Sequence, residues 1–186
     1  MSKKIVVSKK AKIGSKAKLT GRCVIKGKAS VLDQARVSGQ GEVADHAVVK
    51  DSARIAGNAE VIEHAEISGN AWVYQDALVK GSAKVTDRAC VFADAVVGGD
   101  AVVKGLANVG PGARVKSSDH VVTYSAKDIK SKDASGDPRK DDAPQVWTAY
   151  RTRKGGVGVL LGRTPTKVSD APKELLKAVS WTKVKA

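Results

Sequence analysis

Residues 53–73 read ARIAGNAEVIEHAEISGNAWV, and this stretch decides the fold because Ala returns at every sixth position. The same spacing continues without an insertion across residues 11–113, with only Cys23 and Gly41 replacing Ala, and both of these are also small. An aliphatic residue stands two positions after each member of the series, across residues 13–115. An unbroken period of six over this length indicates a structural repeat.

The repeat predicts a short strand and then a turn in each hexad. In a strand, residues i and i+2 point to one side and the residue between them points to the other, so the Ala and the aliphatic residue both face inward. The turns carry Gly, Asn or Asp, as at Gly57–Asn58 and Asp45–His46, and these residues tolerate a left-handed backbone. Three hexads close one triangular coil, so residues 18 apart stack, and the 18 hexads make about six coils.

Two segments carry a family resemblance, Gly57–Val61 and Gly69–Val73. They resemble the bacterial-transferase hexapeptide-repeat superfamily, which implies a left-handed parallel β-helix and a homotrimer. More narrowly, the chain is similar to phage and prophage proteins in which such repeats precede a small module. The matching residues of that module are His120–Thr123, Thr148–Thr152 and Gly155–Gly156. The superfamily contains enzymes and inert scaffolds, so the resemblance does not assign a function.

We therefore expect an all-β protein with two domains. A left-handed parallel β-helix of about six 18-residue coils covers residues 1–118, and a small C-terminal β-hairpin and helix module covers residues 119–186. A polar loop at about 126–145, with Gly and two Pro, is mobile by composition. With little core of its own, the module is expected to pack on the β-helix or on neighbouring subunits.

Within the module, residues 146–152 are expected to pair with residues 157–161 through a tight turn, as a β-hairpin. A short helix is expected over residues 169–179, with Ser169 or Asp170 as its N-cap and Pro and Glu in its first turn.

The net charge of +14 is concentrated at the two ends of the chain. Residues 1–28 hold ten Lys and Arg and no acid, residues 29–118 are nearly balanced, and residues 119–186 hold fourteen basic and eight acidic residues. This pattern favours an anionic partner such as a nucleotide, nucleic acid or membrane surface. Improved solubility is the alternative explanation.

Cysteine content and hydropathy indicate the compartment. Cys23 and Cys90 are too few for a disulfide framework or a metal site, which favours a reducing environment. No apolar run is long enough to span a bilayer, and the N-terminus lacks the apolar stretch of a signal peptide. We expect a cytoplasmic protein without a membrane partner, in the host cytoplasm if it is phage-encoded.

Stacking arithmetic gathers the aromatic residues of the repeats on one outward face. Trp72 and Tyr74 belong to one coil, and Cys90 and Phe92 lie directly beside them on the next. An exposed apolar cluster usually marks an interface, here either a trimer contact or the surface on which the C-terminal module docks. A platform on which a ligand base stacks is the alternative.

His46 and His64 are also 18 residues apart and are expected to stack at one corner. A zinc site needs three or four ligands, and no third His or nearby Cys is evident in the sequence. We therefore predict no metal and no other cofactor, and interpret the pair as solvated turn residues.

The C-terminal module combines guanidinium groups with aromatic rings, a set that suits phosphate contact and base stacking. The predicted ligand-binding residues are Tyr150, Arg151, Arg153, Lys154, Arg163, His120 and Arg139. The alternative is a small hairpin with ordinary surface charges.

Three functional hypotheses follow. The first is a homotrimeric, non-enzymatic binding or scaffold protein, phage-encoded, that binds a nucleotide signal or nucleic acid through the module and the subunit boundaries. The second is a CoA-dependent acyltransferase, but the superfamily's catalytic His on a loop between coils has no counterpart in these uninterrupted hexads. The third is a structural virion or decoration protein. We favour binding over catalysis and predict no catalytic residue.

Overall fold

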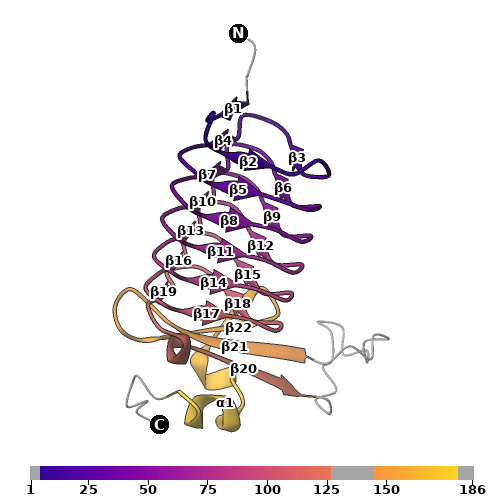
Figure 1. The fold of residues 1–186 in the computed structure, drawn as a ribbon. Coiled ribbons are helices and arrows are strands. Elements are labelled where there is room, and N and C mark those ends of the chain that lie inside the picture. Colours follow the sequence, from indigo (N-terminus) through magenta and orange to yellow (C-terminus); the bar gives the residue numbers. More distant parts are fainter. Residues whose placement is uncertain (1–4, 127–144, 180–186) are drawn as a thin grey trace.

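A computed structural model describes residues 5–126 and 145–179. The chain forms a left-handed parallel β-helix of about six coils, followed by a small antiparallel sheet (Figure 1). This confirms the predicted fold class. The loop predicted at 126–145 lies almost entirely outside the described residues.

The coils stack into three parallel sheets, one for each side of the triangle. Sheet A consists of β1 (Val6–Val7), β4 (Val24–Ile25), β7 (Glu42–Val43), β10 (Glu60–Val61), β13 (Leu78–Val79), β16 (Val96–Val97) and β19 (Arg114–Val115). Sheet B consists of β2 (Lys12–Ile13), β5 (Ser30–Val31), β8 (Val48–Val49), β11 (Glu66–Ile67), β14 (Lys84–Val85) and β17 (Val102–Val103). Sheet C consists of β3 (Lys18–Leu19), β6 (Arg36–Val37), β9 (Arg54–Ile55), β12 (Trp72–Val73), β15 (Cys90–Val91) and β18 (Asn108–Val109).

The register between neighbouring strands is the predicted 18 residues, as in Trp72 opposite Arg54 and Cys90. The inward Ala and aliphatic residues form the core, and Ala71 and Val73 are fully buried. Among the described residues, the first coil has a neighbouring coil on one side only, and Val6, Val7 and Ile13 are exposed.

Polar side chains at the corners connect successive coils. Asp45 has a φ of 61°, a conformation that Asp and Asn adopt more readily than other residues with a side chain. Its Oδ2 accepts a hydrogen bond of 3.1 Å from the backbone N–H of Glu63, 18 residues later. Glu63 repeats the arrangement with the N–H of Gly81 at 2.8 Å. These contacts fix the corner between sheets A and B.

The C-terminal module begins with a 3₁₀ turn, η1 (Ser118–His120), and continues into a four-stranded antiparallel sheet. Its strands are β20 (Val121–Ala126), β21 (Gln145–Arg151), β22 (Val157–Leu161) and β23 (Thr164–Thr166). Pairing of β21 with β22 confirms the predicted hairpin. A second 3₁₀ turn, η2 (Val168–Asp170), and the short helix α1 (Lys173–Lys177) follow.

The predicted N-cap of the helix is wrong. Ser169 and Asp170 lie in η2, and Pro172 occupies the N-cap position of α1. A proline disfavours the helical conformation in the residue before it, and Ala171 is accordingly extended, with φ −75° and ψ 146°. The helix therefore begins after Pro172.

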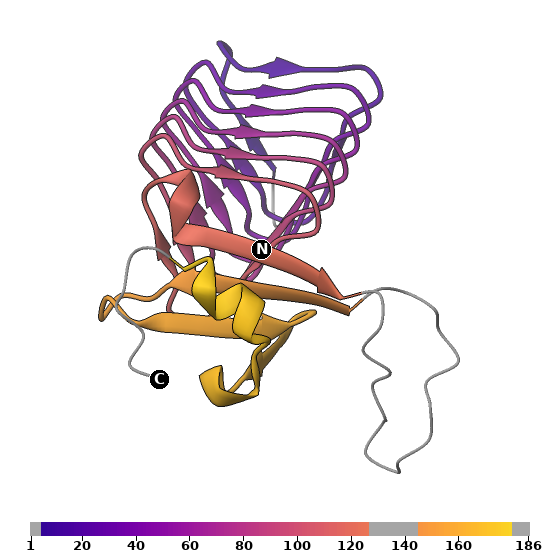
Figure 2. The ribbon, with the colours of Figure 1, turned by 90° about the horizontal axis from the view of Figure 1, so that it is seen from below.

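The module covers the last coil of the β-helix, as seen from below in Figure 2. The Thr148 Oγ1 accepts a hydrogen bond of 3.1 Å from the Asn108 N–H. The Arg153 N–H donates to the Gly112 carbonyl at 2.9 Å. Leu160 and Tyr150 join the core cluster of the β-helix. The core of the β-helix thus extends into the module, which also has a second buried cluster formed by Trp147, Ala149, Val159, Ala171, Leu175 and Val179.

The corner contacts predict a stability difference between two substitutions. Asp45→Ala removes the acceptor for the Glu63 N–H and places Ala in a left-handed conformation, so it should lower the free energy of unfolding by about 1–2 kcal/mol. Asp45→Asn keeps an acceptor and a residue that tolerates this conformation, so it should stay close to the unchanged protein. Urea unfolding measures both, and equal losses would contradict this role of the side chain.

Candidate anion-binding site

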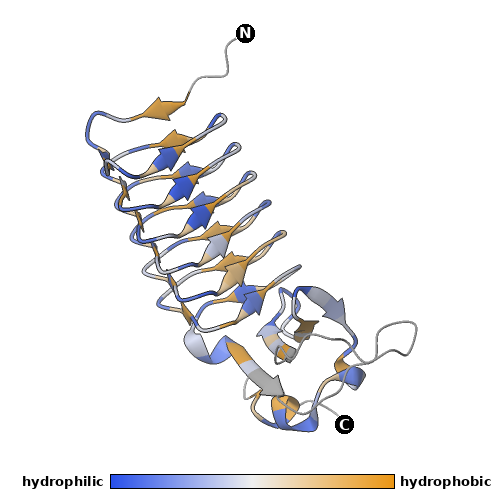
Figure 3. Cartoon of the chain, turned by 90° about the vertical axis from the view of Figure 1, so that its right-hand side faces the viewer, coloured by the Kyte–Doolittle hydropathy of each residue, from blue (hydrophilic) through white to orange (hydrophobic). Residues whose placement is uncertain are grey.

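The outward surface of sheet C, together with the corner between sheets B and C, is named face C here. Its outward strand positions run Lys18, Arg36, Arg54, Trp72, Cys90 and Asn108, and its corner positions run Lys16, Gln34, Ser52, Asn70 and Arg88. Neither row contains an acidic residue, although Asp33, Asp51 and Asp87 each stand one position before a member of the corner row. Figure 3 shows the strands of this face as hydrophilic near the N-terminus, more apolar at β12 and β15, and hydrophilic again at β18.

A cleft of about 280 Å³ lies between these two rows next to the module. Three guanidinium groups line it, those of Arg54, Arg88 and Arg163, together with Trp72. Ser52, Asn70 and Cys90 complete the lining. The first two arginines belong to the β-helix, whereas Arg163 lies in the turn between β22 and β23, so the cleft forms only where the module docks.

Arg163 connects the module to the aromatic cluster. Its Cζ lies 5.0 Å from the Trp72 ring centroid and 5.8 Å from that of Tyr74, within the range of cation–π attraction. Its Nη2 lies 3.2 Å from Cys90 Sγ. The predicted interface patch consists of Trp72, Tyr74, Cys90 and Phe92. Docking of the module, rather than a trimer contact, is the explanation that the observed contacts support.

The remaining members of that patch pack beneath the module. Cys90 is 4% exposed and Phe92 is 7% exposed. The Tyr74 and Phe92 rings stack with centroids 5.4 Å apart. A Cβ added to Gly110 would lie 2.9 Å from Phe92 and 3.1 Å from Leu160 of β22, which shows how closely the two parts approach.

The guanidinium groups of the cleft have no carboxylate partner in an ion pair within the described chain. Across residues 5–126 and 145–179, no ion pair joins Arg54, Arg88 or Arg163 to a carboxylate. Burial raises the pKa of the Cys90 thiol, although the nearby Arg163 charge opposes the shift, so the thiol stays neutral. The buried Trp72 Nε1–H also has no acceptor among the described residues.

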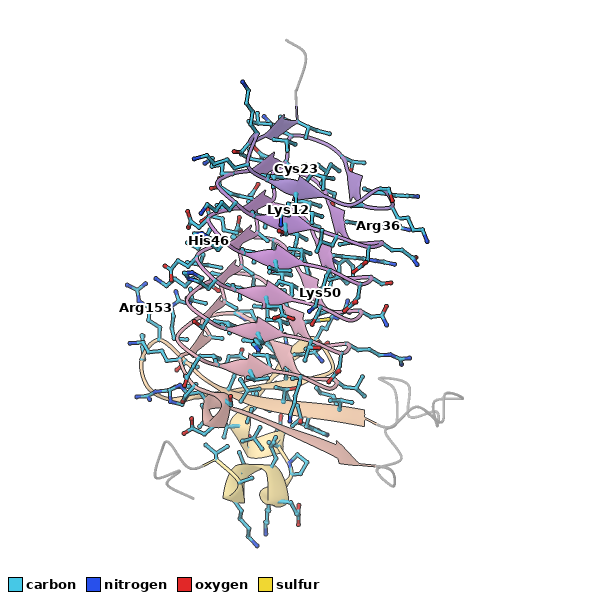
Figure 4. The ribbon with its side chains drawn as sticks, viewed as in Figure 1. Lys12, Cys23, Arg36, His46, Lys50 and Arg153 are labelled. Carbon is cyan, nitrogen blue, oxygen red and sulfur yellow. The ribbon has the colours of Figure 1, made fainter. Side chains whose placement is uncertain are left out.

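The predicted ligand-binding residues of the module are divided between two regions. Arg163 lines the cleft on face C, whereas Arg151 lies beside His120, with Nη1 and Nε2 3.1 Å apart. Arg153 and Lys154 are exposed in the hairpin turn. In Figure 4, Arg153 and Arg36 lie on opposite sides of the molecule. Arg139 lies outside the described residues.

The proposed stacking role of Tyr150 is not compatible with its position. The residue is 3% exposed, and its hydroxyl donates to the Pro111 carbonyl at 3.1 Å. Burial, with a smaller contribution from Asp94, raises its pKa to about 12. Tyr150 faces the core because β21 packs against the last coil, so its ring stabilises the junction rather than a ligand.

His46 and His64 stack as their spacing predicts, with ring centroids 5.1 Å apart and an interplanar angle of 1°. Lys10 and Lys28 continue this row in an open groove at the corner between sheets A and B. In the described part of the chain, no group of three or more His, Cys, Asp and Glu is placed to hold a metal ion. No helix there is long and apolar enough to cross a membrane.

Sequence reasoning assigned Trp72 to an interface and Arg163 to the ligand-binding residues of the module, and it did not include Arg54 or Arg88 in a site. The signal was present, because Arg54 precedes Trp72 by 18 residues and Arg88 follows Asn70 by 18. Comparisons with protein-family models, curated proteins and solved structures found no match to this chain. The site is therefore interpreted from its own geometry.

Tyr150 gives a pH-dependent prediction for the junction. The folded protein holds the phenol protonated up to about pH 12, above the ordinary pKa of 10.0, so its stabilising effect is complete below pH 10 and is lost as the pH rises toward 12. Tyr150→Phe should cost about 0.5–1.5 kcal/mol at pH 8 through the lost hydrogen bond. Urea unfolding at several pH values should show this difference shrinking above pH 10, and a constant difference would contradict it.

Proposed function

We propose that the protein is a non-enzymatic binding protein whose cleft on face C holds a phosphate-bearing ligand of the nucleotide class. The observation that supports this most strongly is the convergence of Arg54, Arg88 and Arg163 around Trp72 without an acidic partner in the described chain. Guanidinium groups match phosphate oxygens in charge and in bidentate geometry. Three of them in one cleft favour a ligand with more than one negative charge.

The aromatic part of the site supports a ligand with a base rather than free phosphate. Trp72 is half-buried, and the Arg163 guanidinium lies over its ring. A nucleobase stacks favourably on an aromatic ring or a guanidinium plane. Ser52 and Asn70 add neutral hydrogen-bonding groups along the corner. The cleft thus combines phosphate and base contacts.

Acyl transfer receives no comparable support. His46 and His64 lie at the corner between sheets A and B, whereas the cleft borders the corner between sheets B and C. Neither histidine can therefore act as a base on a ligand in the cleft. The hexad register continues without an extruded loop through Val115. Membership of the hexapeptide-repeat superfamily and a phage origin remain proposals that rest on the sequence resemblance.

We expect single-residue changes in the cleft to weaken nucleotide binding. Arg88→Ala removes one charged hydrogen-bond donor at an exposed corner, and the loss of such a contact costs about 1.5–3 kcal/mol, roughly tenfold or more in affinity. Lys84→Ala on sheet B removes the same charge from a strand outside the cleft and serves as the control. Isothermal titration with adenosine diphosphate measures both. Equal affinity of the two variants would overturn the assignment of the site.

The homotrimer is a second part of the proposal. The outward face of sheet A carries half-buried apolar residues at Ile62, Leu78 and Val96, which suit a subunit contact and leave face C open. Native mass spectrometry should therefore give a trimer, and Leu78→Asp should dissociate it. A monomer under conditions where the protein is folded would contradict the proposal.

A further inference from the structure

The cleft continues beyond Arg54 as a groove along the axis of the β-helix. A second hollow of about 310 Å³ is lined by Lys18, Arg36, Arg54 and Trp72, among others. A third, of about 360 Å³, reaches Lys16, Lys18 and Arg36 at the first coil. Because consecutive hollows share lining residues, they form one path. At about 4.8 Å per coil, this path from the coil of Lys18 to that of Cys90 is roughly 19 Å long.

The cations along this path are stacked directly on one another. Lys18 pairs in register with Arg36, and Arg36 pairs with Arg54. Like charges directly opposite each other on neighbouring strands destabilise a sheet. This arrangement therefore opposes folding unless an anion lies along the row.

On each of the other two faces, a lysine forms an ion pair with a glutamate of the next coil. On sheet A, Lys26 forms an ion pair of 3.0 Å with Glu42, and on sheet B, Lys50 forms one of 2.8 Å with Glu66. The nearest acids at the corner of face C, including Asp33 and Asp51, direct Oδ2 to backbone N–H groups of the next coil. On face C, no ion pair within the described residues includes Lys18, Arg36 or Arg54.

We propose that the ligand is a single-stranded nucleic acid lying along face C, and this inference rests on the function proposed above. Its phosphates follow the line of Lys18, Arg36, Arg54 and Arg88, and a base at one end reaches Trp72 beneath Arg163. One line of cations matches one sugar–phosphate backbone, and stacking on Trp72 requires an unpaired base. A mononucleotide would leave Lys18 and Arg36 without an anion.

The direct test measures affinity against ligand length. Fluorescein-labelled oligothymidylates of one to twelve nucleotides are titrated with the full chain and followed by fluorescence anisotropy. Affinity should rise with length and level off at about four to six nucleotides, near the lower end of single-strand site sizes. One phosphate contact for each of the four cations should give a slope of log K against log salt of about −2.8.

Variants test whether the line of cations carries the contacts. Arg36→Gln should weaken binding of the hexanucleotide and reduce the magnitude of the salt slope by about 0.7. Lys84→Gln removes the same charge from the exposed position on sheet B and should leave the slope unchanged. Equal effects of the two variants would mean that only the net charge matters, which overturns the inference.

The remaining outcomes separate this inference from the proposed function. If adenosine diphosphate binds but oligothymidylate affinity does not increase with length, the single-strand inference is wrong and the nucleotide site stands. If a duplex of equal length or poly-glutamate binds as tightly as the single strand, the inference is also wrong. If no phosphate-bearing ligand binds, both proposals fail.

Discussion

The hydrogen bonds between coils are the constraint on which the whole molecule depends. A backbone N–H on one coil donates to the carbonyl 17 residues later, as from Lys18 to Ala35, from Arg36 to Ala53 and from Arg54 to Ala71, each at 2.9 Å. The coil length is thereby fixed at 18 residues, because one extra residue would turn every later side chain to the opposite face. Because every coil has the same register, residues 18 apart in the sequence lie in one row along the surface.

Charge pairing differs between the three faces because these rows bring different charged residues together on each face. On sheets A and B, a carboxylate near the lysine of the preceding coil forms an ion pair, as with Glu42 and Glu66. On face C, basic residues occupy successive positions, and the line ends at Trp72 and Cys90 beneath Arg163. The fold supplies a rigid spacing, whereas the choice of side chains makes one of three similar surfaces chemically distinct.

The sequence predicts the repeat region well and the packing of the C-terminal module less well. The period of six determined the coils, the buried Ala and aliphatic residues, the stacked His46 and His64 and the aromatic cluster, because each follows from counting residues. The C-terminal module has no repeat, and its packing depends on how β21 fits the last coil. Sequence reasoning therefore included Tyr150 among the ligand-binding residues, whereas the structure buries it at the junction. The cleft was missed because Arg163 reaches it only through that packing.

The module covers one end of the β-helix, and Val6, Val7 and Ile13 are exposed at the other end in the described part of the chain. A β-helix of this kind changes in length by whole coils of 18 residues. A duplication of 18 residues among the early coils would add one layer to each sheet and extend face C by one side chain. The junction with the module would keep its contacts, because its partners lie on the last coils. The length of face C can therefore change in evolution while the residues around Trp72 stay the same.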